Sequence, residues 1–141
     1  MAEIKCVIND VKSGKSYTKA VEDQIFVGRK LGDKVAGAAV GLPGYELVIA
    51  GGSDSAGFPM VYFLDTGMRK RIILRKGIGL RTRKKKALPK SAIKRRALRG
   101  SQVNNFTAQL NLKVVQYGAK SIEELFGIPP KEAAPEQKPA K

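Results

Sequence analysis

The sequence predicts a mainly β fold: a small antiparallel β-barrel-like domain with one or two short helices, a long basic surface segment and a disordered C-terminal tail. Three observations lead to this class. Several short segments alternate apolar and polar residues with the period of two that is typical of strands. Glycine-rich turns separate these segments, and few stretches have the period of a helix. We therefore expect one domain over residues 1–127 and a disordered tail over residues 128–141.

The N-terminal residues predict a β-hairpin followed by a short helical stretch. The sequence EIKCVIND at residues 3–10 alternates strictly, and KSGK at residues 12–15 provides a turn. A second strand is expected over residues 16–21. Asp23 is a candidate cap for a helical stretch over residues 24–30, although the apolar residues there also suit a strand.

The later elements follow the same reasoning. Further strands are expected at residues 45–50, 68–75 and 102–118, the last as one long strand or a bent pair. A short helix is expected over residues 121–127, with Ser121 as its N-cap and Glu124 three residues later as the capping-box partner.

Positive charge is concentrated in one part of the chain. The net charge is +15. Residues 1–65 hold seven Lys or Arg and eight Asp or Glu, whereas residues 66–122 hold 17 Lys or Arg and no acidic residue. An ordinary surface mixes both signs, because like charges repel one another and destabilise the compact state. A polyanionic partner therefore explains residues 66–122 better than a merely solvated surface does.

The residue types in this region indicate recognition of an RNA backbone. Lysine provides a point charge, and arginine adds a planar fork that grips phosphate through two hydrogen bonds. Almost no aromatic residue lies between the charges, which argues against a base-stacking platform and favours recognition of folded RNA by its backbone and shape. The candidate RNA-binding residues are Arg69, Lys70, Arg71, Arg75, Lys76, Arg81, Arg83, Lys84, Lys85, Lys86, Lys90, Lys94, Arg95, Arg96 and Arg99, and candidates for additional polar contacts are Asn104, Asn105 and Gln109.

The basic segment itself is expected to lie on the surface. Residues 76–100 hold too few large apolar side chains to contribute to a core. Within them, residues 91–100 are a candidate short helix, with Ile93 and Leu98 on part of its surface.

The stretch GGSDSAGFPM at residues 51–60 predicts a tightly shaped loop. Asp54 is expected to bond the loop backbone, and Phe58 to plug the loop into the core. The alternative is that backbone N–H groups and serine hydroxyls of the loop bind phosphate. The candidate structural loop residues are Gly51, Gly52, Asp54, Gly57, Phe58 and Pro59.

Enzymatic, metal-binding and cofactor-binding functions find no support in the composition. The chain contains no His, which excludes a His-based catalytic triad and argues against a zinc site. Cys6 is the single cysteine and lies on the apolar face of a predicted strand, as a small buried hydrophobe would. No stretch approaches the roughly 18 apolar residues of a membrane span. We expect a protein that is not an enzyme and needs neither cofactor nor metal.

Three stretches together resemble one known family. GYELVIAGGSDSAGFPM at residues 44–60, KRRALRG at residues 94–100 and LNLKVVQYGAKSI at residues 110–122 are similar, in order and spacing, to the small-subunit ribosomal protein six of the type shared by archaea and eukaryotes. The glycine-rich stretch is the most specific of the three. The likeness covers about residues 3–127.

This resemblance implies a structural constituent of the small ribosomal subunit in the cytoplasm, which binds ribosomal RNA and supports translation beside neighbouring ribosomal proteins. It implies no catalysis, no membrane and no small-molecule substrate. Eukaryotic members of the family continue into a long basic helix with a phosphorylated serine cluster. This chain resembles the short archaeal form, so the kinase-regulated role is not carried over.

Two other functions stay open on the residues alone. A chromatin- or DNA-binding protein would carry a similar charge. A cationic chaperone or membrane-surface protein would need an amphipathic apolar face beside the charges, and residues 79–100 offer only scattered Leu and Ile.

Overall fold

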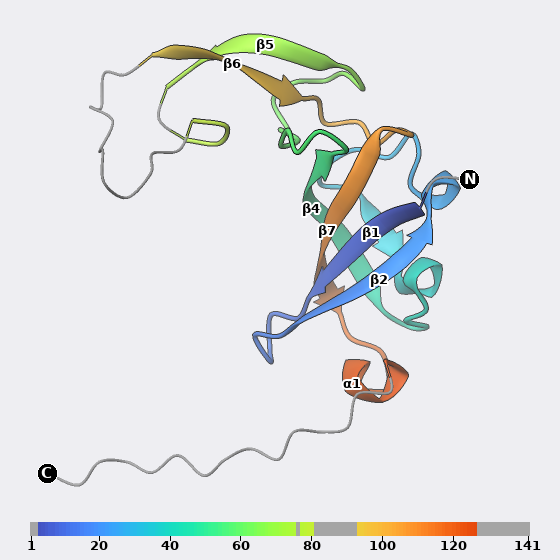
Figure 1. The fold of residues 1–141 in the computed structure, drawn as a ribbon. Helices are drawn as coiled ribbons and strands as arrows, with labels where there is room; N and C mark the ends of the chain where they lie inside the picture. The colour runs from blue at the N-terminus through green and yellow to red at the C-terminus, as the bar shows by residue number, and fades with distance from the viewer. Residues whose placement is uncertain (1–2, 76, 81–92, 127–141) are drawn as a thin grey trace, which may run out of the picture.

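The computed structural model describes residues 3–75, 77–80 and 93–126. In this part of the chain a curled five-stranded sheet encloses most of the core, and a separate two-stranded ribbon extends from it (Figure 1). The predicted mainly β, barrel-like class is confirmed. The predicted disordered tail lies outside the described residues.

The N-terminal hairpin forms as the alternating sequence predicts. Strand β1 (Glu3–Asn9) pairs antiparallel with β2 (Ser16–Glu22). A 3-10 turn over Asp23–Ile25 follows, so the helical stretch predicted over residues 24–30 is wrong.

The remaining strands of the sheet come from the middle and the end of the chain. They are β3 (Lys34–Ala36), β4 (Glu46–Asp54) and β7 (Thr107–Gln116). A second 3-10 turn over Gly37–Val40 joins β3 to the loop before β4. Strand β3 and this turn were not predicted, because a three-residue strand is too short to display a period.

The sheet order is β2-β1-β7-β4-β3. One pairing departs from the antiparallel expectation, because β1 runs parallel to β7, with Cys6 opposite Leu110 and Ile8 opposite Leu112. Parallel neighbours require a long connection, and here nearly the whole chain lies between the two strands. The first and last strands therefore lie side by side at the centre of the sheet (Figure 1).

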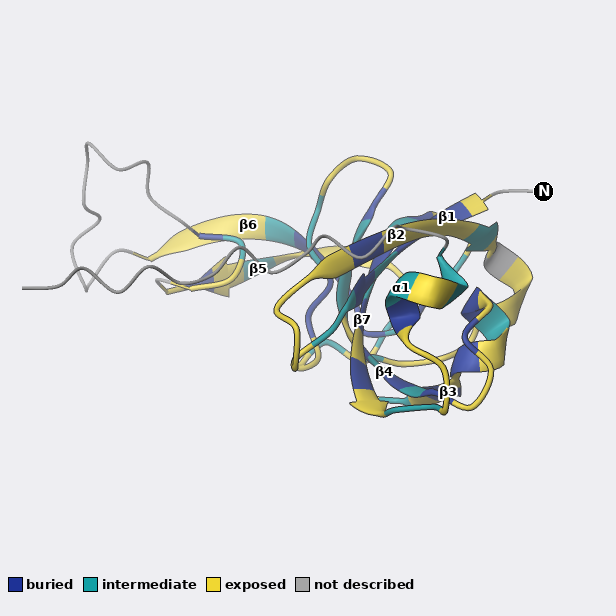
Figure 2. Ribbon diagram, turned by 90° about the horizontal axis from the view of Figure 1, so that it is seen from below, coloured by how far each residue is buried: buried dark blue, intermediate teal, exposed yellow. Residues whose placement is uncertain are grey.

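The main core lies on the inner face of this curled sheet (Figure 2). Alternate residues of the three central strands point inward, so that the period of two seen in the sequence becomes a continuous apolar layer. Phe26 and Leu42 are also fully buried and close the core from the connecting segments. The fully buried residues of these three strands are Ile4, Cys6, Ile8, Leu47, Ile49, Leu110 and Leu112.

A short helix, α1 (Ile122–Leu125), packs Ile122 onto the core after β7. The hydroxyl of Ser121 accepts a hydrogen bond from the backbone N–H of Glu124 at 3.4 Å. The N-cap predicted at Ser121 is confirmed.

Burial gives the single cysteine a testable property. Cys6 is fully buried in β1, and this burial raises the pKa of its thiol to about 11. Because the thiolate is the reactive form, we expect native protein at pH 8 to resist alkylation by iodoacetamide and to react only on unfolding. Mass spectrometry with and without urea measures this, and rapid labelling of the native protein would contradict the burial.

Candidate nucleic-acid interface

The ribbon consists of β5 (Arg69–Leu74) and β6 (Lys94–Arg99), paired antiparallel. The strand predicted at residues 68–75 is confirmed, whereas the helix considered for residues 91–100 is wrong. The residues of β6 form a strand because β5 provides a partner distant in sequence, which a local pattern does not reveal.

The register keeps most of the positive charges apart. Arg71 lies opposite Ala97, and Ile73 opposite Arg95, so that each cation faces an uncharged residue. The same holds for the pairs Lys70–Leu98, Ile72–Arg96 and Leu74–Lys94. Like charges directly opposite each other are destabilising, and this interleaving avoids them at five of the six paired positions.

The two faces of the ribbon differ in burial. One face carries Leu74 and Leu98, which pack with Val61 and Leu80 into a second apolar cluster that is distinct from the main core. The expectation that residues 76–100 contribute nothing to a core is therefore wrong for Leu80 and Leu98, which are 2% and 0% exposed. On the other face Arg71, Ile73 and Arg95 are exposed, whereas Arg99 at its end is buried.

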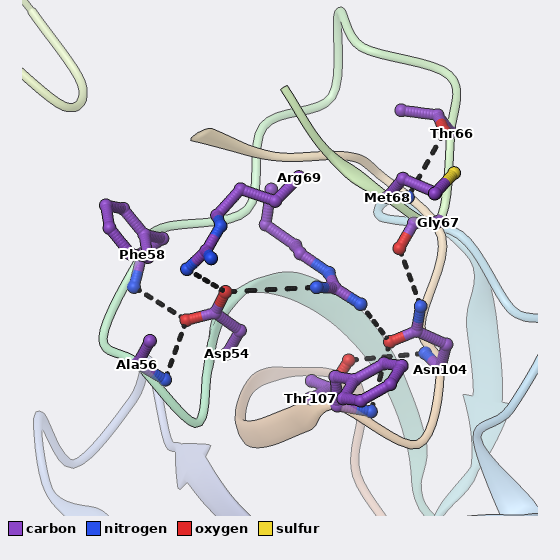
Figure 3. A network of polar contacts seen from close by, with 11 residues as sticks. Asp54, Ala56, Phe58, Thr66, Gly67, Met68, Arg69, Asn104 and Thr107 are labelled. Atoms are coloured by element: carbon purple, nitrogen blue, oxygen red, sulfur yellow. Dashed lines mark hydrogen bonds and ion pairs between the residues drawn. The ribbon is translucent and has the colours of Figure 1, made fainter. Parts of the chain in front are cut away.

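One cross-strand pair does place two cations opposite each other, Arg69 and Arg99, and a buried carboxylate lies beside it. The Oδ2 atom of Asp54 is 3.9 Å from a guanidinium nitrogen of Arg99 and 4.0 Å from one of Arg69 (Figure 3). Asp54 comes from the end of β4, so this contact joins the ribbon to the main sheet. At these distances the interactions are ion pairs rather than hydrogen bonds.

The Arg99 side chain is held inside the protein. The residue is only 7% exposed, and its guanidinium donates a hydrogen bond of 2.6 Å to the side chain of Asn104. Asn104 in turn donates to the carbonyl of Gly67 at 2.6 Å (Figure 3). Arg99 and Asn104 were both candidates for RNA contact, but the two terminal guanidinium nitrogens of Arg99 and the side-chain amide of Asn104 are directed to partners within the chain. The Nε atom of Arg99 is buried and has no hydrogen-bond partner among the described residues.

The other carboxylate oxygen of Asp54 organises the glycine-rich loop. Its Oδ1 atom accepts hydrogen bonds from the N–H groups of Ala56 at 3.0 Å and Phe58 at 2.8 Å. This is the bonding of Asp54 to the loop backbone that the sequence predicted. The backbone N–H groups of Asp54, Ser55 and Gly57 also bond carbonyl groups within the chain. The five consecutive amides of residues 54–58 are therefore occupied, which argues against the alternative of a phosphate-binding loop.

Phe58 does not plug into the core as predicted. It is only half-buried, and the centroid of its ring lies 4.5 Å from the guanidinium carbon (Cζ) of Arg69 (Figure 3). A cation–π contact of this kind positions Arg69 at the base of the ribbon. The prediction failed because a phenylalanine flanked by glycine and proline gives no sequence signal for the cation above it.

The glycines of this stretch have separate roles. A Cβ atom on Gly52 would lie 2.5 Å from the carbonyl oxygen of Gln109, so glycine is required where β4 approaches β7. Gly57 has a φ of +80°, which favours glycine at the turn below Asp54. Pro59 pairs with Ser53 in an isolated bridge, and its carbonyl accepts a hydrogen bond from the N–H of Arg99 at 3.0 Å.

Comparison of the sequence with known proteins assigns the chain to a family. The family model described as "Ribosomal protein S6e" matches residues 4–127. The chain belongs to the ribosomal protein S6e family. The resemblance inferred from the three sequence stretches is confirmed.

Curated archaeal relatives agree with this assignment. A protein named small ribosomal subunit protein eS6 from Methanococcus maripaludis is 39% identical over 114 residues, which cover 81% of this chain and 88% of the relative. Proteins of the same name from Methanococcoides burtonii and Methanocaldococcus jannaschii are 39% and 36% identical and cover 90% and 91% of this chain, and 92% and 94% of their own lengths. These relatives are ribosomal proteins rather than enzymes, in agreement with the predicted non-enzymatic class.

Within this S6e-family chain, the candidate RNA-binding residues fall into three groups. Arg99 is buried, and Arg69 is half-exposed between Phe58 and Asp54. The exposed cations on or next to the ribbon are Lys70, Arg71, Arg75, Lys94, Arg95 and Arg96. The candidates outside the described residues are Lys76, Arg81, Arg83, Lys84, Lys85, Lys86 and Lys90.

Membrane spans and metal clusters are both absent from the described residues of the S6e-family chain. No helix in this part of the chain is long and apolar enough to cross a membrane. Within the same residues, no three Asp, Glu or Cys side chains gather into a group that could hold a metal ion.

Proposed function

We propose that this chain is a structural constituent of the small ribosomal subunit and that it binds ribosomal RNA through the β5–β6 ribbon. The observation that carries the proposal is uncompensated positive charge. Lys70, Arg71, Arg95 and Arg96 are exposed, and none of them forms an ion pair with another residue that the structure describes. Their mutual repulsion is relieved when phosphates lie between them.

The form of the ribbon supports contact with the backbone rather than with base edges. Six residue pairs span about 20 Å at the usual strand rise, which is long enough to pass several successive phosphates. An isolated two-stranded ribbon is marginally stable in water, and here the second apolar cluster supports one face of the ribbon. The exposed cations, which come from both faces, are free for RNA. The basic residues at 76 and 81–90 adjoin the same ribbon in sequence and are proposed to extend this contact.

The family supports the identity of the RNA. The relatives are named as small-subunit proteins, so small-subunit ribosomal RNA and neighbouring ribosomal proteins are the proposed partners, and the cytoplasmic ribosome is the place of action. Residues 1–127 are proposed to act as one domain, since Asp54 joins the ribbon to the main sheet.

Salt dependence of binding tests this function. With about six phosphates neutralised, the logarithm of affinity for small-subunit ribosomal RNA of Methanococcus maripaludis is expected to fall with log salt at a slope of roughly −4 to −5. A variant with Lys70→Gln, Arg71→Gln, Arg95→Gln and Arg96→Gln is expected to flatten this slope by about 0.7–0.9 for each phosphate that it no longer neutralises. Filter binding between about 50 and 200 mM salt measures both slopes.

A control removes the same charge from the main sheet region. Its substitutions are Lys5→Gln, Lys19→Gln, Lys113→Gln and Lys120→Gln, all at exposed positions. We expect this control to retain the parental slope more fully than the ribbon variant. Equal slopes for the two variants would refute the ribbon as the RNA contact. Equal affinity for duplex DNA of matched length at the same salt would favour the DNA-binding alternative.

A further inference from the structure

An exposed aromatic pair lies at the base of the ribbon. Tyr62 is 74% exposed and Phe63 is 54% exposed, and their ring centroids are 5.7 Å apart in an edge-to-face arrangement. Aromatic rings normally contribute large buried areas, and a contiguous exposed pair is typical of a binding surface. The sequence analysis argued against base stacking because almost no aromatic residue lies between the charges of the basic segment. Tyr62 and Phe63 come from an earlier part of the chain, and the fold places the segment that carries them against the basic ribbon.

The backbone that carries the two rings is fixed in place. Val61, on one side of the pair, is buried in the second apolar cluster, and Leu64, on the other side, packs against the same cluster. The N–H of Val61 donates to the carbonyl of Arg99 at 3.0 Å, and the N–H of Ser101 donates to the carbonyl of Leu64 at 2.8 Å. The backbone on either side of the rings is therefore ordered before binding, so that little backbone entropy remains to be lost.

Cations lie on the ribbon face against which the residues flanking the pair are packed. Val61 and Leu64 pack against the ribbon face that carries Leu74 and Leu98. On that face Lys70 lies opposite Leu98 and Arg96 lies opposite Ile72, and both cations are exposed. The neighbouring acidic residue, Asp65, is paired with Lys30 at 2.9 Å, so its charge is compensated.

We propose that Tyr62 and Phe63 form a stacking platform for an unpaired base of the RNA that the ribbon holds, an inference that rests on the proposed function. Every base has a π-face, and an aromatic ring beside a phosphate-binding cation holds both parts of one nucleotide. Two exposed rings on a segment that packs against the cationic ribbon fit an anionic nucleotide better than an apolar protein surface. An apolar partner that extended onto the ribbon would leave its charges desolvated and unpaired.

A double variant tests the platform. Tyr62→Ser with Phe63→Ser is expected to lower affinity for the same ribosomal RNA by roughly fivefold to a hundredfold for one stacked base, at every salt concentration. The salt slope is expected to remain parental, because no phosphate contact is removed. The control is Val11→Ser with Val115→Ser, which removes two exposed apolar side chains elsewhere and is expected to leave affinity unchanged.

A fluorescent variant provides an independent measurement. The chain contains no Trp, so Tyr62→Trp introduces a single reporter that retains the ability to stack. We expect its emission to be quenched by ribosomal RNA and not by a fully paired RNA duplex, in which no base is free.

Three outcomes overturn the inference. If the double variant retains its affinity within twofold and the ribbon variant still flattens the salt slope, the platform fails and the proposed function stands. If the double variant binds RNA normally but is lost from assembled small subunits, the pair contacts a neighbouring protein instead. If the parental chain does not bind ribosomal RNA, the proposed function and the platform fail together.

Discussion

Replacement of Asp54 by alanine is expected to lower the free energy of unfolding by about 3–5 kcal/mol. Asp54 is 5% exposed, and its carboxylate is the acidic partner of the buried Arg99 guanidinium at 3.9 Å. Removal of the carboxylate leaves that charge buried without its counter-ion, which costs far more than the loss of a surface ion pair. The N–H groups of Ala56 and Phe58 also lose their acceptor. Urea unfolding followed by circular dichroism measures the change.

Two comparisons separate this explanation from a general effect of losing an acidic residue. Asp65→Ala removes an exposed carboxylate paired with Lys30 and is expected to change stability much less. Adding Arg99→Met to Asp54→Ala replaces the uncompensated buried charge by an apolar side chain. Part of the stability lost in Asp54→Ala is therefore expected to return in the double variant. A loss for Asp54→Ala no larger than that for Asp65→Ala would contradict the role assigned to the buried pair.

The regular strands were predictable because a strand that is buried on one face alternates apolar and polar residues along the sequence. In β1, Ile4, Cys6 and Ile8 alternate with exposed or half-exposed residues, and the structure buries these three positions. The cap of α1 was predictable for a related reason, since Ser121 acts on an N–H only three residues away. Both signals are local and need no knowledge of distant partners.

The features that the sequence did not reveal depend on distant contacts. The parallel pairing of β1 with β7 is set by how the sheet closes. In β6, a Lys/Arg-rich sequence has no strong preference, and pairing with β5 decides its conformation. The Lys and Arg residues at positions 69–99 were all candidates for RNA contact, because charge alone cannot distinguish Arg99, which faces Asp54, from Arg95 or Arg96, which are exposed.

The stacking pair was missed for the same reason. Almost no aromatic residue lies between the charges of the basic segment, whereas Tyr62 and Phe63 precede that segment and reach the ribbon through Val61 and Leu64. The sequence does contain an indication, since four consecutive large apolar residues in a connecting segment cannot all point into the core. In the structure Val61 and Leu64 pack against the second apolar cluster, and Tyr62 and Phe63 between them are exposed.

Replacement of Leu98 by alanine is expected to loosen the ribbon by about 2–5 kcal/mol while leaving the main sheet closed. Leu98 is fully buried among Val61, Leu74 and Leu80, so truncation leaves a cavity in a cluster that has few other members. This cluster is distinct from the main core that contains Cys6. Local opening of such a unit does not require global unfolding.

Two measurements on the same sample distinguish local from global opening. Hydrogen exchange of the β5–β6 amides is expected to accelerate about 30-fold or more in Leu98→Ala. Alkylation of Cys6 reports on the main sheet and is expected to stay slow, because burial of this thiol raises its pKa to about 11. The matched control is Ile73→Ala on the open face of the same ribbon, where the side chain is 64% exposed and little change is expected. If Cys6 becomes reactive together with the ribbon amides, the two clusters open as one unit, and the view of the ribbon as a separately stabilised RNA-binding element fails.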